Sequence, residues 1–189
     1  FYRDFFVFSK NLTALKNTML IGFSTVVVGG LIGGVLAFLI NAFKFKWAPI
    51  ANILVIAPMM IPGNLYVMTI MKLYGGGGII THLYMLAFGL DKQPWEVTGF
   101  GAIMLIHALT QYILFYIILS AGISKLDMSV IEAARGLGAK PWRVLKDAVL
   151  PMMVPSIISG SILTFIGGIS SYAAPSMVGG TFKTMTVQI

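Results

Sequence analysis

The chain has 189 residues, of which 58% are hydrophobic and only 10% are charged, and its mean hydropathy is +0.91. Soluble domains carry roughly 25% charged residues, so this composition excludes a soluble globular protein and indicates a polytopic membrane protein. The net charge of +7 comes from basic residues scattered at the ends of apolar runs, which is typical of membrane loops and argues against nucleic-acid binding. Cysteine is absent, so disulfides and thiolate metal sites are excluded.

Four long uncharged stretches predict membrane-spanning helices, because about 20 apolar residues cross the roughly 30 Å hydrocarbon core. We place these spans near residues 17–43, 50–72, 98–123 and 152–172. The predicted fold class is an all-α transmembrane helical bundle, forming a single membrane domain over residues 1–189. Because the chain starts without methionine and ends in an apolar segment, we expect a fragment truncated at both ends.

The first span contains two overlapping GxxxG patterns, formed by Gly29 with Gly33 and by Gly30 with Gly34. Small residues at this spacing let two helices approach closely in lipid. We therefore expect this face of the first span to pack against a neighbouring helix.

The second span is interrupted by Pro58, Pro62, Gly63 and Asn64. A proline removes one helical hydrogen bond and kinks the helix, so these residues predict a locally broken helix. Broken helices at membrane depth are tolerated where they line protein or water. Asn64 is thus a candidate for the translocation path, and a kink that serves only packing is the alternative.

A run of glycines, Gly75 to Gly78, follows the second span and predicts a flexible turn. About twelve residues of helical periodicity come next, too few to cross a bilayer, so we expect a helix at the interface or packed on the spans. The polar residues of the third span include His107 and Gln111, which lie four apart on one helical face. They are candidates for the translocation path, with interhelical hydrogen bonding as the alternative. With His82 the only other histidine, we expect no metal site.

The loop over residues 125–150 is the longest polar interruption and holds three of the six acidic residues. Asp127 suits a helix start, and Ser129 with Glu132 fits a capping box. Gly136 and Gly138 predict the end of that short helix.

A second short helix is predicted to begin at Pro141. On the first helix, Ser129, Glu132 and Arg135 are spaced three apart and are expected to share a face, while Met128 and Ile131 point elsewhere.

This loop resembles the EAA loop of ABC-transporter permeases from binding-protein-dependent importers. The family pattern is EAA, three residues, Gly, nine residues, Ile, one residue and Leu-Pro. The chain has Glu132-Ala133-Ala134, Gly138 and Leu150-Pro151 at these spacings, and departs from the pattern only at Ala148, where the isoleucine would stand.

The resemblance implies a bundle like that of type I ABC importer permeases, with about four spans and cytoplasmic coupling helices in this fragment. It implies that the loop docks on a separate ATPase subunit, with Glu132, Ala133, Ala134, Arg135 and Gly138 as the docking residues. It also implies a second permease half (identical or different), an extracytoplasmic solute-binding protein and a multi-pass location in the cytoplasmic (inner) membrane. ATP would be bound by the partner, because this chain has no Walker A pattern and binds no cofactor of its own.

A further, shorter resemblance follows the fourth span. There, Tyr172, Pro175, Gly179-Gly180 and Lys183-Thr184 are similar to a segment of the branch that includes iron(III) and polyamine permeases. Ser171 and Ala173 depart from that segment, which has an acidic residue and a glycine at those places. We expect residues 171–184 to be non-helical, with Pro175 ending the preceding helix.

Two other classes of function are alternatives to the importer permease. An intramembrane enzyme requires paired carboxylates or a nucleophile with its base at membrane depth, and no carboxylate lies within any predicted span. An ion-coupled secondary transporter or a channel is the alternative reading, although such proteins usually carry intramembrane Asp, Glu or Arg along the path. We therefore expect a transport subunit that is not an enzyme.

Overall fold

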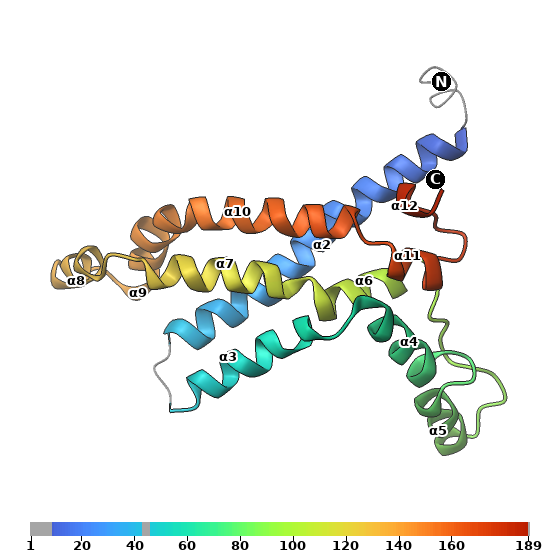
Figure 1. Ribbon diagram of the computed structural model, residues 1–189. Helices are drawn as coiled ribbons and strands as arrows, with labels where there is room; N and C mark the ends of the chain where they lie inside the picture. The colour runs from blue at the N-terminus through green and yellow to red at the C-terminus, as the bar shows by residue number, and fades with distance from the viewer. Residues whose placement is uncertain (1–8, 43–45, 189) are drawn as a thin grey trace.

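The computed structural model describes residues 9–42 and 46–188 and consists of helices joined by short turns. Three long helices form its centre: α2 (Ser9–Ala42), the pair α6 (Gly99–Thr110) and α7 (Tyr112–Ser124), and α10 (Leu150–Ile169). Helices α7 and α10 run side by side, and α2 crosses them and packs against both (Figure 1). Within the described residues, three segments are long and apolar enough to cross a membrane, namely Lys10–Asn41, Gly99–Ser124 and Pro141–Ile169.

The predicted break in the second span is a sharp turn rather than a kink. Helix α3 (Ala48–Ile56) continues into the 3₁₀ helix η1 (Ala57–Met60), and α4 (Gly63–Tyr74) leaves at 93° to them. The prolines at 58 and 62 explain the break, because neither can donate a helical hydrogen bond and Ile61 is left in an extended conformation between the two helices. The locally broken helix predicted within the span near 50–72 is therefore confirmed, with the break at Ile61 and Pro62.

Helix α5 (Ile79–Phe88) occupies the short amphipathic stretch predicted after the glycines. The Gly78 amide donates to the Gly75 carbonyl at 2.8 Å, which closes the turn between α4 and α5. The indole of Trp95 and the hydroxyl of Thr81 both donate to the Tyr74 carbonyl at 2.9 Å. These two bonds satisfy the carboxyl end of α4 and hold the polar loop 91–96 against it.

The second half of the loop over residues 125–150, with the helix that follows it, differs from the prediction in two ways. Helix α9 (Pro141–Val144) begins at Pro141 as expected, but it is not separate, because the π-helical turn η2 (Leu145–Val149) joins it to α10. The wide turn stands immediately before Pro151, whose ring would crowd the Asp147 carbonyl in a regular α-helix. The helix that contains the fourth predicted span thus begins well before residue 152 and ends at Ile169.

The segment expected to be non-helical contains two short helices, α11 (Ala173–Val178) and α12 (Met185–Gln188). Pro175 lies in the first turn of α11, where a missing amide costs nothing, instead of ending α10. The Asn17 side chain donates to the Lys183 carbonyl, and the Met185 amide donates to the Thr18 hydroxyl, both at 2.9 Å. These two hydrogen bonds therefore hold residues 183–185 against the first half of α2.

Two apolar clusters lie at opposite ends of α2. One joins the first half of α2 to α4, α6 and α11 around Ile21, Val67 and Ile103, and the other joins its second half to α7 and α10 around Ala37 and Tyr116. Helix α2 therefore connects both parts of the bundle. Phe43, the last residue of the predicted first span, lies outside the described residues.

The glycine pattern of the first span packs as predicted. A Cβ on Gly29 would lie 3.2 Å from Thr164 of α10, and a Cβ on Gly33 would lie 2.4 Å from the Tyr112 carbonyl oxygen of α7. A Cβ on Gly33 would force α2 and α7 apart, whereas one on Gly29 would require Thr164 to give way by a few tenths of an ångström.

Candidate functional site

The short helix α8 (Met128–Gly136) of the loop is capped by Asp127. The Asp127 carboxylate accepts a hydrogen bond from the Ser129 amide at 2.9 Å. The predicted capping box of Ser129 with Glu132 is therefore wrong, because Asp127 already stands at the N-cap position and reaches the free amide two residues on. Hydrogen bonds from the Ser129 side chain and amide lower the pKa of Asp127, so this cap is ionised at neutral pH.

The glycines end α8 as predicted. Helix α8 stops at Gly136, and Gly138 has a φ of +80°, the left-handed region that favours glycine. The Gly138 amide donates to the Arg135 carbonyl at 2.9 Å, and the Ala139 amide donates to the Ala134 carbonyl at 3.1 Å. The chain thus reverses within a few residues and enters α9 with a defined geometry.

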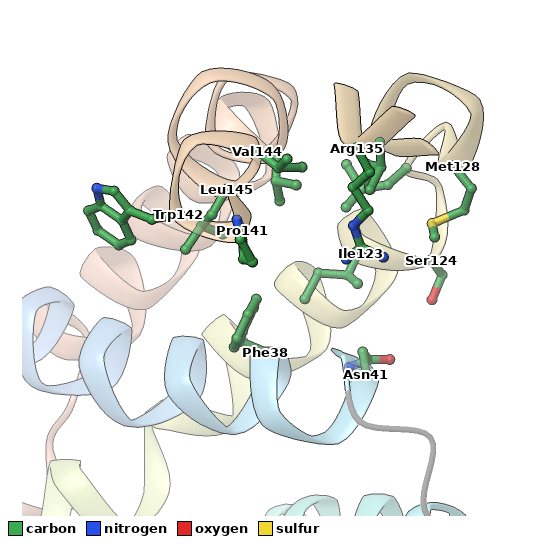
Figure 2. A pocket seen from close by; sticks show the side chains of 13 residues that line it. Phe38, Asn41, Ile123, Ser124, Met128, Arg135, Pro141, Trp142, Val144 and Leu145 are labelled. Carbon is green, nitrogen blue, oxygen red and sulfur yellow. The ribbon is translucent and has the colours of Figure 1, made fainter. Parts of the chain in front are cut away.

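The motif residues occupy different faces of α8. Glu132 and Ala133 are exposed, and Leu137, just past the helix, is 90% exposed. Arg135 is also exposed, but it lines a cavity between α8 and the ends of α2 and α7 with Met128 (Figure 2), and Ile131 is part of the same lining. The prediction that Arg135 points away from Met128 and Ile131 is therefore wrong, because residues at positions 128, 131 and 135 follow the three-four spacing of one helical face.

Three buried polar side chains, Thr25, His107 and Thr164, form a polar layer between the two apolar clusters, about halfway along α2. The Thr25 hydroxyl donates to the Ile21 carbonyl and lies 2.7 Å from His107 Nδ1. Because the single hydroxyl hydrogen is used on the carbonyl, Nδ1 is the donor to Thr25 and carries the histidine proton, which leaves Nε2 as an acceptor. His107 is only 2% exposed, and its Nε2 has no hydrogen-bond partner in the described part of the chain.

The predicted path residues do not all come together. His107 and Gln111 line one cavity of about 270 Å³, with Thr110, Ser171 and Gly63 also in its wall. Asn64 is exposed at the start of α4 and is not part of this lining. The cavity lies where the α3–α4 turn meets the junction of α6 and α7, so the break around Pro62 forms part of its wall.

Sequence reasoning missed two members of the polar layer. Thr25 holds His107, and the Thr164 hydroxyl of α10 is buried without a hydrogen-bond partner among the described residues. Their signal in the sequence is weak, since each is a lone threonine in an apolar run and threonine often bonds its own helix backbone.

Two tyrosines of α7 fasten the broken second span to the centre of the bundle. The Tyr112 hydroxyl donates to the Val55 carbonyl at 2.9 Å, and the Tyr116 hydroxyl donates to the Asn52 side chain. Within residues 9–42 and 46–188, no group of three or more His, Cys, Asp or Glu side chains is placed to hold a metal ion.

The chain matches the family model described as "Binding-protein-dependent transport system inner membrane component" over residues 12–189. It is 27% identical over 167 residues to a probable ABC transporter permease protein, y4fN, of Sinorhizobium fredii, which covers 88% of this chain and 29% of that protein. It is 21% identical over 175 residues to the ferric transport system permease protein FbpB of Actinobacillus pleuropneumoniae, covering 93% of this chain and 25% of the relative.

A third relative is the spermidine/putrescine transport system permease protein PotB of Haemophilus influenzae, which is 27% identical over 151 residues, with 79% of this chain and 52% of PotB covered. The chain therefore spans about a quarter to a half of the length of these curated relatives.

Two solved structures have a similar fold. A bacterial alginate ABC transporter in complex with a pentasaccharide-bound periplasmic protein aligns with a TM-score of 0.73 and 19% identity, over 98% of this chain and 65% of the other. An amino acid ABC transporter aligns with a TM-score of 0.61 and 21% identity, over 94% and 74%. The match over residues 12–189, together with the shared fold, shows that this chain belongs to the inner-membrane components of binding-protein-dependent transport systems.

Proposed function

We propose that this chain is the membrane-spanning permease subunit of an ATP-driven importer, and that α8 couples it to a separate ATPase subunit. The observation that carries the proposal is the position of α8, which projects beyond the ends of α2 and α7 at one end of the molecule (Figure 1). The Glu132–Ala133–Ala134 motif lies on this projecting helix, with Glu132 and Ala133 exposed. A capped helix with exposed small residues suits docking into a cleft on a partner.

The connections of α8 suit the transmission of a movement. At its amino end, the Lys125 and Leu126 amides donate to the carbonyls of Gly122 and Ile123 at 3.1 Å, so α8 follows α7 through a tight turn. At its carboxyl end, the Gly138 reversal leads into the continuous helix that runs through η2 into α10. A displacement of α8 by the ATPase would therefore move α7 and α10 together, and both pack on α2.

The solute path is proposed to pass the cavity that His107 and Gln111 line. Its polar groups are neutral in charge, which suits weak and transient contacts with a passing solute. Asn64 lies at the adjoining turn and would meet the solute outside this cavity. ATP would be bound and hydrolysed by the partner subunit.

Membership of the family supports the proposal of the remaining partners. We propose a second permease half, identical or different, and a solute-binding protein that delivers the cargo on the side opposite α8. The names of the ferric and spermidine/putrescine relatives support a cargo of the iron(III) or polyamine branch. The multi-pass chain would lie in the cytoplasmic membrane with α8 on the cytoplasmic side.

Cysteine cross-linking tests the docking directly, because the chain has no native cysteine. Ala133→Cys on α8 is paired with cysteines along the cleft of the co-expressed ATPase subunit, and Leu83→Cys on the exposed face of α5 is the matched control. We expect a cross-link from position 133 whose yield changes when ATP is added, and none from position 83. An assembled complex in which position 133 forms no cross-link would refute the docking of α8.

A further inference from the structure

The cavity beside α8 has a volume of about 660 Å³ and lies on the side of that helix facing the bundle. Its walls are mostly apolar and come from the ends of α2 and α7 and from α8, α9 and η2. Phe38 and Ile123 are among the lining residues (Figure 2), and Ile131 is another. The exposed face of α8 that carries Ala133 points away from it. A molecule in this cavity would therefore leave the proposed docking face free.

Arg135 gives this cavity its charge. It is the one charged side chain in the lining formed by the described residues, and no carboxylate lines the cavity. Its side chain reaches from α8 toward Ile123 at the end of α7 (Figure 2), and no ion pair or hydrogen bond of the guanidinium is found in the described part of the chain. A guanidinium beside apolar walls favours an anionic partner, above all a phosphate, which it can bind through two parallel hydrogen bonds.

A second cavity continues the first one into the membrane-spanning part. It has a volume of about 320 Å³ and follows the groove between α2, α7 and α10, where Val35, Leu119 and Met153 line it. Phe38, Ile123, Leu145 and Val149 belong to both linings. Together they form one groove with a cationic group at the loop end and an apolar course along the spans.

We propose that this groove binds a phospholipid with an anionic headgroup from the membrane leaflet on the α8 side. The headgroup phosphate contacts Arg135, and an acyl chain follows the apolar course past Phe38 and Val149. A soluble phosphate would pair with Arg135 but leave the apolar course empty, and a zwitterionic lipid offers no net charge to the guanidinium. The bound lipid holds α8 against the ends of α2 and α7, which would make the movement of α8 dependent on lipid composition.

Photo-crosslinking tests this proposal and does not depend on docking to an ATPase. The full-length permease is purified with the subunits that accompany it and placed in nanodiscs of equal phosphatidylglycerol and phosphatidylcholine. Either lipid in turn carries a diazirine in one acyl chain, and labelled peptides are mapped by mass spectrometry. We expect phosphatidylglycerol to label the peptides that contain Phe38, Ile123 or Val149 about fivefold more than phosphatidylcholine does, as one basic contact with an anionic headgroup predicts.

The variants separate the Arg135 contact from the general charge of the loop. Arg135→Gln is expected to remove the preference and Arg135→Lys to retain most of it. Arg143→Gln, an equal loss of charge on the same loop but outside the lining, is expected to leave it intact. Equal labelling by the two lipids, an unchanged preference in Arg135→Gln, or removal of the preference by added inorganic phosphate would overturn the proposal.

Discussion

The close approach of α2 and α7 predicts different outcomes for two adjacent glycines. A Cβ on Gly33 would lie 2.4 Å from the Tyr112 carbonyl oxygen and 2.9 Å from the Tyr116 amide nitrogen, both backbone atoms of α7. A Cβ on Gly34 would lie 3.6 Å from a methyl group of Leu119, which is an ordinary contact. Gly33→Ala must therefore push the two helices apart, whereas Gly34→Ala needs no movement.

The magnitude follows from comparing the two substitutions. Both gain the same helix propensity, about 1 kcal/mol for Gly→Ala, so this contribution cancels between them. The difference between the two variants is therefore the overpacking at Gly33. Ordinary carbon contacts lie near 3.5–4.0 Å, and backbone atoms cannot rotate away from the added methyl group. Such overpacking costs roughly 1–3 kcal/mol. For a chain of this size, that difference corresponds to a Tm lower by about 2–12 °C.

The measurement is thermal unfolding of the two purified variants in the same detergent, followed as loss of monodisperse protein. We expect Gly33→Ala to unfold at the lower temperature, with Gly34→Ala at or slightly above the unfolding temperature of the parent protein. A Gly33→Ala variant as stable as Gly34→Ala would show that α2 and α7 do not pack backbone to backbone at this point, and the arrangement of the bundle centre would then be wrong.

Four further outcomes are expected. Glu132→Ala should abolish transport in proteoliposomes while membrane insertion and assembly stay intact, and lost insertion would instead assign Glu132 to folding. Gln111→Leu should slow solute transport with ATP hydrolysis retained, whereas unchanged transport would remove Gln111 from the path. Thr25→Val leaves the His107 Nδ1–H unpaired and should lower the free energy of unfolding by about 0.6 kcal/mol, measured against Val28→Thr as the reverse exchange on the same helix. Asp127→Ala removes the accepting oxygen and should weaken protection of the Ser129 amide in hydrogen exchange near neutral pH, and no difference there would refute the cap.

The Asp127 prediction carries a defined pH dependence. The folded-state pKa lies below the ordinary carboxyl value, so the cap stabilises α8 fully above about pH 4 and loses this contribution as the pH falls through the lowered folded pKa. The difference in Ser129 protection between Asp127→Ala and the parent protein should therefore shrink on acidification. A difference that grows toward low pH would contradict the assignment of Asp127 as an ionised cap.

Much of the loop could be read from local residue chemistry. Asp127 at a helix start, the left-handed turn at Gly138 and the helix start at Pro141 are properties of a few neighbouring residues, and the structure places all three as expected. The identity of the N-cap residue of α8 could not be predicted from the sequence, because Asp127 and Ser129 are both good N-cap residues and lie two positions apart. Only the observed start of α8 at Met128 decides between them.

The sequence by itself determined that this chain is an all-α membrane protein with a motif-bearing polar loop, because long uncharged runs and the spacing of Glu132, Gly138 and Pro151 are local properties. The tertiary structure alone decided which polar residues meet. His107 bonds Thr25 from 82 positions away, Arg135 points into the groove, and α4 turns by 93° after Pro62. The physical reason is that nearly every helical face of an apolar chain can be buried, so hydrophobic periodicity does not specify which helices pack together. Close packing at glycines such as Gly33 specifies those partners.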